Sequence, residues 1–162
     1  MLEQNTGEIV LDRTFDAPRD IVWKAWTTPE AMKLWWGPKD FTAPYIAIDL
    51  RVGGQYLCCM RSLDGQNFWS TGVYKEIVPM ERLVCTDSFS DAEGNVVPAT
   101  YYGMSADFPM TLEVTITFED TDEGRTLMTL HHVGVPEGEM AQQCRLGWDQ
   151  SFDKLSEALK QL

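Results

Sequence analysis

The chain has 162 residues, of which 44% are hydrophobic and 11% are aromatic. This length is typical of a single domain, with enough apolar material to bury about 70% of the unfolded surface. The net charge of -12, from 25 acidic residues against 13 Lys and Arg, opposes binding to nucleic acid, whose phosphates favour basic surfaces.

The beginning of the chain carries no targeting signal. Residues 1–8 lack a basic region followed by an apolar run, and no stretch of about 18 apolar residues occurs anywhere. We therefore expect a cytoplasmic protein without a membrane span. The cysteines, which form no C-x-x-C pair, are expected to be free and mostly buried. They are Cys58, Cys59, Cys85 and Cys144.

The first elements are a strand and two short helices. Alternating apolar residues predict a strand over residues 8–15. Pro18 suits the first position of a helix, and the apolar residues that follow it have helical spacing. Thr28 is expected to be the N-cap of a second short helix, which Gly37 ends. Of the adjacent pair Trp35 and Trp36, one is expected to pack in the core and the other to line an opening.

The middle of the chain has the period-two pattern of a β-sheet. It predicts strands at about 43–50, 54–62, 67–78 and 82–90, with glycine turns between several of them. Two further strands, over residues 112–118 and about 125–133, are expected to form a hairpin. The irregular segment 90–109 between these groups is rich in aromatic residues, which favours a packed lid over a disordered loop.

A long helix is predicted from about residue 137 to the end of the chain. Its apolar side chains are spaced by three or four and form one stripe. These residues are Met140, Cys144, Trp148, Phe152, Leu155, Leu159 and Leu162. Gly147 in the middle of the helix costs about 1 kcal/mol relative to alanine, which a close approach of the backbone to the sheet or to a ligand would explain. The order of elements indicates an α+β fold, in which this helix covers the concave face of a curved antiparallel sheet.

The two histidines have different expected positions. Period two places His132 inward with Met128 and Leu130, and His131 outward, so the pair cannot bind one metal ion. The interpretations of His132 are a hydrogen-bonded core residue, which we favour, or a catalytic group. No sequence motif for a metal, a phosphate, a cofactor or a serine nucleophile occurs, so we expect neither metal nor cofactor.

Several segments resemble the bacterial homologues of the activator of heat-shock-protein ATPase, in the START-like (SRPBCC) superfamily. The similar segments cover nearly the whole chain. They are residues 17–27 (APRDIVWKAWT), 34–38 (LWWGP), 49–54 (DLRVGG), 64–65, 72–79 (GVYKEIVP), 81–83, 147–148 and 152–155.

The resemblance implies a helix-grip fold around a deep hydrophobic pocket, in one START-like domain over residues 1–162 with a lid-like insertion at about 90–109. Because the superfamily includes lipid carriers, hormone receptors, aromatic polyketide cyclases and co-chaperones, it does not imply one activity.

Our leading hypothesis is a protein that binds a small hydrophobic or aromatic ligand in an internal cavity, rather than an enzyme. The candidate ligand-binding residues are aromatic, methionine and histidine side chains of the sheet, the lid and the helices. They are Trp36, Tyr56, Met60, Trp69, Tyr102, Met104, Met128, His132, Trp148 and Phe152.

Two alternatives stay open. One is a cyclase-like enzyme for aromatic or polyketide-like substrates, in which His132 and a tyrosine or a carboxylate such as Asp87 move protons. The other is a co-chaperone that regulates an ATPase through its surface. The sequence also leaves open a homodimer and the identity of the ligand.

Overall fold

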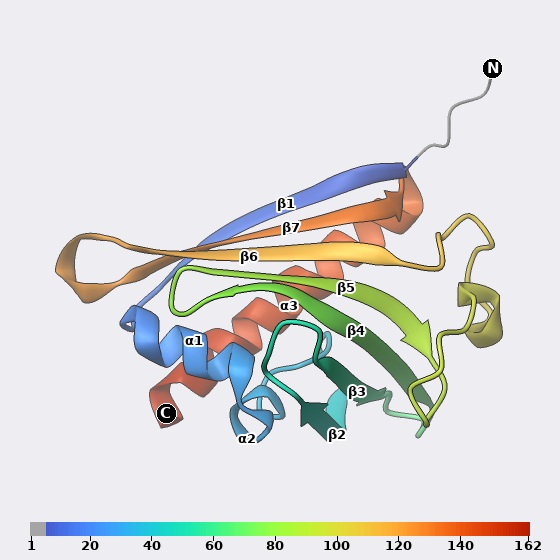
Figure 1. Cartoon of the computed structure of the whole chain (residues 1–162), viewed down its shortest axis with the longest axis horizontal. Coiled ribbons are helices and arrows are strands. Elements are labelled where there is room, and N and C mark those ends of the chain that lie inside the picture. The colour runs from blue at the N-terminus through green and yellow to red at the C-terminus, as the bar shows by residue number, and fades with distance from the viewer. Residues whose placement is uncertain (1–5) are drawn as a thin grey trace.

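The structure is a computed structural model that describes residues 6–162, and its frame is one antiparallel sheet of seven strands (Figure 1). The order across the sheet is β1-β7-β6-β5-β4-β3-β2. The strands are β1 (Thr6–Phe15), β2 (Thr42–Ile48), β3 (Gln55–Arg61), β4 (Asn67–Val78), β5 (Arg82–Ser90), β6 (Leu112–Asp120) and β7 (Thr126–Pro136).

The helices occupy two places in the chain. The helices α1 (Arg19–Thr27) and α2 (Pro29–Met32) follow β1, and α3 (Glu139–Ala158) follows β7. The short 3-10 helices are η1 (Ala99–Tyr102), η2 (Asp122–Gly124) and η3 (Leu159–Gln161). In the part of the chain that the structure describes, no helix is both long and apolar enough to cross a membrane.

The predicted architecture is confirmed. Strands β2 to β7 each pair with their neighbour in sequence, and β1 joins the free edge of β7. Figure 1 shows the sheet curving with α3 crossing behind it. The core between them is apolar, and Phe15, Phe118, Met128 and Leu155 are each at most 2% exposed. This is the α+β helix-grip arrangement that the sequence and the resemblance predict.

Basic side chains fix α3 at two points. Arg13 of β1 pairs with Asp149 and Asp153 of the helix. Lys154 donates to the carbonyl oxygens of Gly37 and Phe41, both at 3.0 Å, and burial lowers its pKa. Lys154 therefore holds the loop after α2 against α3.

Two details of the helices differ from the predictions. Pro18 is the N-cap of α1 rather than its first residue. Thr28 does precede α2, but its hydroxyl makes no capping bond there, because Oγ1 donates to the carbonyl oxygen of Lys24 at the end of α1. The backbone at Gly147 does not approach the sheet closely: a Cβ there would meet only Pro38, at an ordinary contact distance of 3.5 Å.

The segment between β5 and β6 is packed against the end of the sheet. A bridge joins Ser90 to Val96, and the amide of Trp69 donates to the Tyr102 hydroxyl at 3.0 Å. The hydroxyl in turn donates to the carbonyl oxygen of Ser90. Tyr102 thus continues the hydrogen bonding between β4 and β5 where their own ladder ends.

Candidate functional site

A small cavity lies between the sheet and the helices. Its volume is about 50 Å³, which is enough for a few water molecules, since each needs roughly 10–15 Å³. The lining residues come from α1, α2, α3, four strands and the loop after α2. They are Trp26, Met32, Trp36, Tyr56, Tyr74, Leu83, Cys85, Asp87, Val114, Ile116 and Trp148.

Three indole rings explain why the cavity is smaller than the deep pocket that the resemblance implies. The ring of Trp26 lies 6.4 Å from that of Trp36 and 6.2 Å from that of Trp148. Trp36 and Trp148 are 5.6 Å apart, nearly perpendicular to each other. The tryptophans occupy much of the space under α3, so a ligand larger than a few heavy atoms requires them to move.

A polar cluster interrupts the apolar wall of this cavity. The Tyr56 hydroxyl lies 3.2 Å from Oδ1 of Asp87 and 3.0 Å from the carbonyl oxygen of Thr86. Oδ2 of Asp87 lies 3.1 Å from Nε2 of His132. On the other side of the ring, Nε1 of Trp148 donates to Nδ1 of His132 at 3.0 Å. Side chains from β3, β5, β7 and α3 therefore meet in one chain of polar contacts.

Glycine makes room for this cluster. A Cβ on Gly72 of β4 would lie 1.9 Å from the carbonyl oxygen of Thr86 and 2.4 Å from Cε2 of Tyr56. Only glycine fits between β5 and the tyrosine ring without displacing one of them. Gly72 therefore allows Tyr56 to reach Asp87.

Two opposing effects act on the pKa of His132. Burial lowers its pKa, but the carboxylate of Asp87, 3.1 Å from Nε2, outweighs burial and raises it. The Trp148 indole can only donate, so its bond to Nδ1 requires a neutral ring with its proton on Nε2. Protonation of His132 and the bond from Trp148 thus exclude each other.

Tyr56 remains a hydrogen-bond donor. Burial and, after it, the negative charge of Asp87 raise its pKa well above the ordinary value. Loss of the phenolic proton beside a carboxylate would bring two negative charges together. The cluster thus presents a carboxylate flanked by a phenol and an imidazole.

Two buried donors in the described residues have no hydrogen-bond partner: Nε1 of Trp36 and Nε2 of His132. The second is near Asp87, but its N–H does not point at the carboxylate oxygen well enough to form a bond. A buried polar group without a partner costs about 1–3 kcal/mol. Trp36 lines the cavity, so its donor is available to an acceptor there. His132 does not line the cavity, and Asp87 lies between its Nε2 and the cavity wall.

The structure brings four of the ten candidate residues together at this site. Trp36, Tyr56 and Trp148 line the cavity, and His132 stands directly behind it. Its inward position is confirmed by an exposure of 5%, while the His131 ring is exposed and contacts Glu8.

The other six candidates lie elsewhere. Met128 and Phe152 are buried in the solid core at the end of the cavity, and Met60 packs beside Gly37. Trp69 pairs with Cys59 on the opposite face of the sheet, where its ring lies 5.6 Å from that of Tyr45.

The two candidates in the inserted segment also lie apart from the cavity. The Tyr102 ring packs 5.4 Å from that of Phe68, and Met104 is 41% exposed. The segment therefore packs on the end of the sheet and contributes no residue to the wall of the internal cavity.

The sequence reasoning missed seven apolar or weakly polar lining residues. The alternation of strands 82–90 and 112–118 contained the signal for four of them, because it marks every second residue as inward. The missed residues are Trp26, Met32, Tyr74, Leu83, Cys85, Val114 and Ile116.

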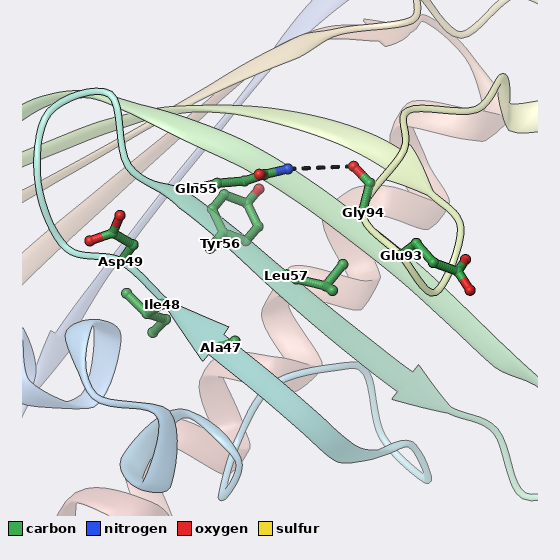
Figure 2. Close-up of a pocket in the computed structure, with 8 residues that line it drawn as sticks. All are labelled: Ala47, Ile48, Asp49, Gln55, Tyr56, Leu57, Glu93 and Gly94. Carbon is green, nitrogen blue, oxygen red and sulfur yellow. Dashed lines mark hydrogen bonds between the residues drawn. The ribbon is translucent and has the colours of Figure 1, made fainter.

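A second depression lies at the edge of the sheet, with a volume of about 240 Å³ (Figure 2). Figure 2 shows Gln55 reaching towards Gly94, whose carbonyl oxygen is 3.4 Å away. Gln55 also donates to Thr71 at 2.9 Å. Because this amide already has partners, the groove lacks the unpaired donor that distinguishes the internal cavity. Its lining residues are Ala47, Ile48, Asp49, Gln55, Tyr56, Leu57, Glu93 and Gly94.

The described residues contain no group of three or more His, Cys, Asp or Glu side chains arranged to hold a metal ion. The polar groups at this cavity are Tyr56, Asp87 and His132, which contact one another by a hydrogen bond and an ion pair.

The curved sheet, the long covering helix and the cavity between them define a helix-grip protein. Over residues 16–160 the chain matches the family described as Activator of Hsp90 ATPase homolog 1-like protein, and it belongs to that family.

Solved structures from bacteria share this fold. A protein from Chromobacterium violaceum is 30% identical, with a TM-score of 0.77 and coverage of 94% of this chain and 96% of the other. A protein from Nitrosomonas europaea is 24% identical, with a TM-score of 0.76 and coverage of 99% and 97%. The AHSA1 protein of Silicibacter pomeroyi is 20% identical, with a TM-score of 0.74 and coverage of 95% and 98%. A comparison with curated proteins finds no match.

Proposed function

We propose that this protein binds a compact molecule with an apolar or aromatic body and one oxygen acceptor in the cavity under α3. The observation that carries the proposal is a buried donor without a partner in the wall of the cavity, Nε1 of Trp36. A carbonyl oxygen that accepts from this donor would remove the cost of leaving it unpaired.

The rest of the cavity suits the body of such a ligand. Its wall is mostly apolar and aromatic, with Trp26, Leu83 and Ile116 among the lining residues. Sites of this kind use the apolar wall for affinity and a few polar groups for orientation. The volume of about 50 Å³ favours a short chain or a small ring, and the ring requires the surrounding tryptophans to move apart.

Matched pairs of probes test the need for an acceptor. Cyclopentanone and methylenecyclopentane have similar shapes, but only the ketone has an oxygen. We expect the ketone to bind about threefold to tenfold more tightly, the worth of one hydrogen bond, in calorimetric titrations with purified protein. Equal binding of the two probes, or binding of neither, would contradict the proposal.

Two tryptophans provide a matched control in the protein. Both line the cavity, but Nε1 of Trp36 has no partner while Nε1 of Trp26 donates to the sulfur of Met128. We expect Trp36→Phe to reduce the preference for the ketone and Trp26→Phe to leave it unchanged. The reverse order would place the acceptor at another part of the wall.

A second function, cyclase-like proton transfer on a bound ketone, is favoured by one further observation. The two oxygens of Asp87 lie next to two possible donors. Oδ1 is 3.2 Å from the Tyr56 hydroxyl, and Oδ2 is 3.1 Å from Nε2 of His132. A carboxylate can remove a proton next to a carbonyl group while a neighbouring donor stabilises the enolate oxygen.

Exchange in deuterated water tests this step. The α-proton NMR signals of cyclopentanone should disappear faster with the protein than without it, and His132→Gln should slow the exchange. His131→Gln changes the adjacent histidine on the outer face and should have no effect. Exchange that is no faster than in buffer would leave binding as the function of the site.

A further inference from the structure

One cysteine differs from the other three in its surroundings. Cys58, Cys59 and Cys85 are buried on strands, and burial raises the pKa of each thiol. Cys144 is on α3 and partly exposed, and its Sγ lies 3.6 Å from Nδ1 of His132. Within the described residues it is the thiol with both solvent access and a base beside it.

We propose that Cys144, His132 and Asp87 form a nucleophilic triad that captures small α,β-unsaturated carbonyl compounds as covalent thioethers. The geometry has the three required parts. The thiol is within hydrogen-bond reach of the imidazole, and the other ring nitrogen lies 3.1 Å from the carboxylate. A nucleophile, a base and an acid that orients the base recur in enzymes that use activated cysteine.

The helix places the thiol near Trp148. Cys144 precedes Trp148 by four residues, so both side chains lie on the same face of α3. Trp148 donates to the same nitrogen of His132 that Cys144 contacts. Cys144 itself does not line the cavity but packs against the buried cluster of Ile9, Leu112 and Val135. An electrophile therefore reaches the thiol from solvent, along an apolar surface one helical turn from Trp148.

The addition balances without any other reactant. The thiol proton passes to Nδ1 of His132, which requires the Trp148 N–H to turn away. Sulfur then bonds to the β-carbon, and the electron pair of the double bond moves to the carbonyl oxygen as an enolate. Return of the proton from His132 to the α-carbon gives a neutral thioether and a neutral imidazole.

Asp87 supplies the negative charge beside His132. The titratable groups facing His132 are Asp87 from β5 and Cys144 from α3, with Tyr56 of β3 beyond the carboxylate. The strand partners of His132 on β1 and β6 are apolar, Ile9 and Val114. Asp87 is therefore the group that stabilises the imidazolium formed when His132 takes the thiol proton.

The test is alkylation of the intact protein by substoichiometric N-ethylmaleimide or crotonaldehyde, followed by mass spectrometry of its peptides. We expect Cys144 to be modified first, and at pH 7 it should react faster than the thiol of glutathione. His132→Gln should slow the reaction by about tenfold or more, and Asp87→Asn should slow it less.

Controls separate this inference from the proposed function. His131→Gln should leave the rate unchanged, and Cys144→Ser should abolish the adduct while reversible binding of cyclopentanone persists. The inference is overturned if Cys144 reacts no faster than glutathione at pH 7, or if its rate is insensitive to both triad substitutions. The rate measured on the unmodified protein at pH 7 gives this answer even where a variant does not fold.

Discussion

The two halves of α3 cover different parts of the sheet. Under its C-terminal half, Phe152 and Leu155 pack on Phe15 and Leu130, all at most 1% exposed and wholly apolar. Under its N-terminal half, Cys144 and Trp148 face His132 and a cavity with polar groups in its wall.

The difference separates stability from function. Close-packed apolar side chains are the main source of folding free energy. Buried charges and unpaired donors act against folding unless they serve another purpose. The C-terminal half of α3 should therefore carry the stability, and the N-terminal half should carry the chemistry.

Truncation in each half tests this division most strongly. Leu155→Ala should lower the free energy of unfolding by about 2–5 kcal/mol, because it leaves a cavity in the solid core. Cys144→Ala, on the same face of α3 but partly exposed, should cost less than about 1 kcal/mol. Urea denaturation measures both, and equal losses would contradict the comparison.

A smaller effect is expected on how the stability of the protein depends on pH, because a titrating histidine lies under the N-terminal half of α3 only. The pKa of His132 is raised above its ordinary value of 6.5, so its contribution to stability is complete below pH 6.5. That contribution is lost as the pH rises through the raised pKa of the folded state. A shift of one pKa unit corresponds to about 1.4 kcal/mol.

Denaturation at several pH values checks this prediction. His132→Gln should flatten the fall in stability above pH 6.5, the ordinary pKa of the ring. Leu155→Ala should lower the whole curve and keep its slope. If the His132 variant and the wild-type protein have parallel curves, the histidine does not titrate as the contacts with Asp87 indicate.

The smallest predicted effect lies between the two halves, at Gly147. A Cβ there would meet only Pro38 at 3.5 Å, and alanine favours a helix over glycine by up to about 1 kcal/mol. Gly147→Ala should therefore raise the melting temperature and leave the binding of cyclopentanone unchanged. A loss of stability would show that the loop of Pro38 needs the space.

Sequence patterns predicted correctly which side chains of the strands and of the C-terminal helix point inward. They did not predict where along the sheet each inward side chain lies. Period two placed His132 inward, and the stripe on the C-terminal helix placed Phe152 and Leu155 against the sheet, as the structure confirms. The same patterns could not separate Phe152 in the core from Trp148 at the cavity, because both lie on one stripe. Whether a residue of the stripe meets the core or the cavity depends on how the strands pair beneath the helix.

The polar cluster shows the same limit. Asp87 was a candidate partner of His132, but their meeting depends on the register that pairs Asp87 with Leu112 and Val114 with His132. No local pattern specifies that register across three strands. Whether the donors of Trp36 and His132 have partners depends on the directions of their side chains, and the sequence specifies these directions less than it specifies the register.

Indole NMR tests the central claim, that the cavity binds an oxygen acceptor through an unpaired donor, most directly. The Nε1–H groups of Trp26, Trp35 and Trp148 already have partners, whereas that of Trp36 has none. On titration with cyclopentanone, the Trp36 signal should move downfield while that of Trp35, bonded to Ala25, stays in place. Methylenecyclopentane should not cause this shift. An unchanged Trp36 signal, with no response of the His132 ring, would contradict the account.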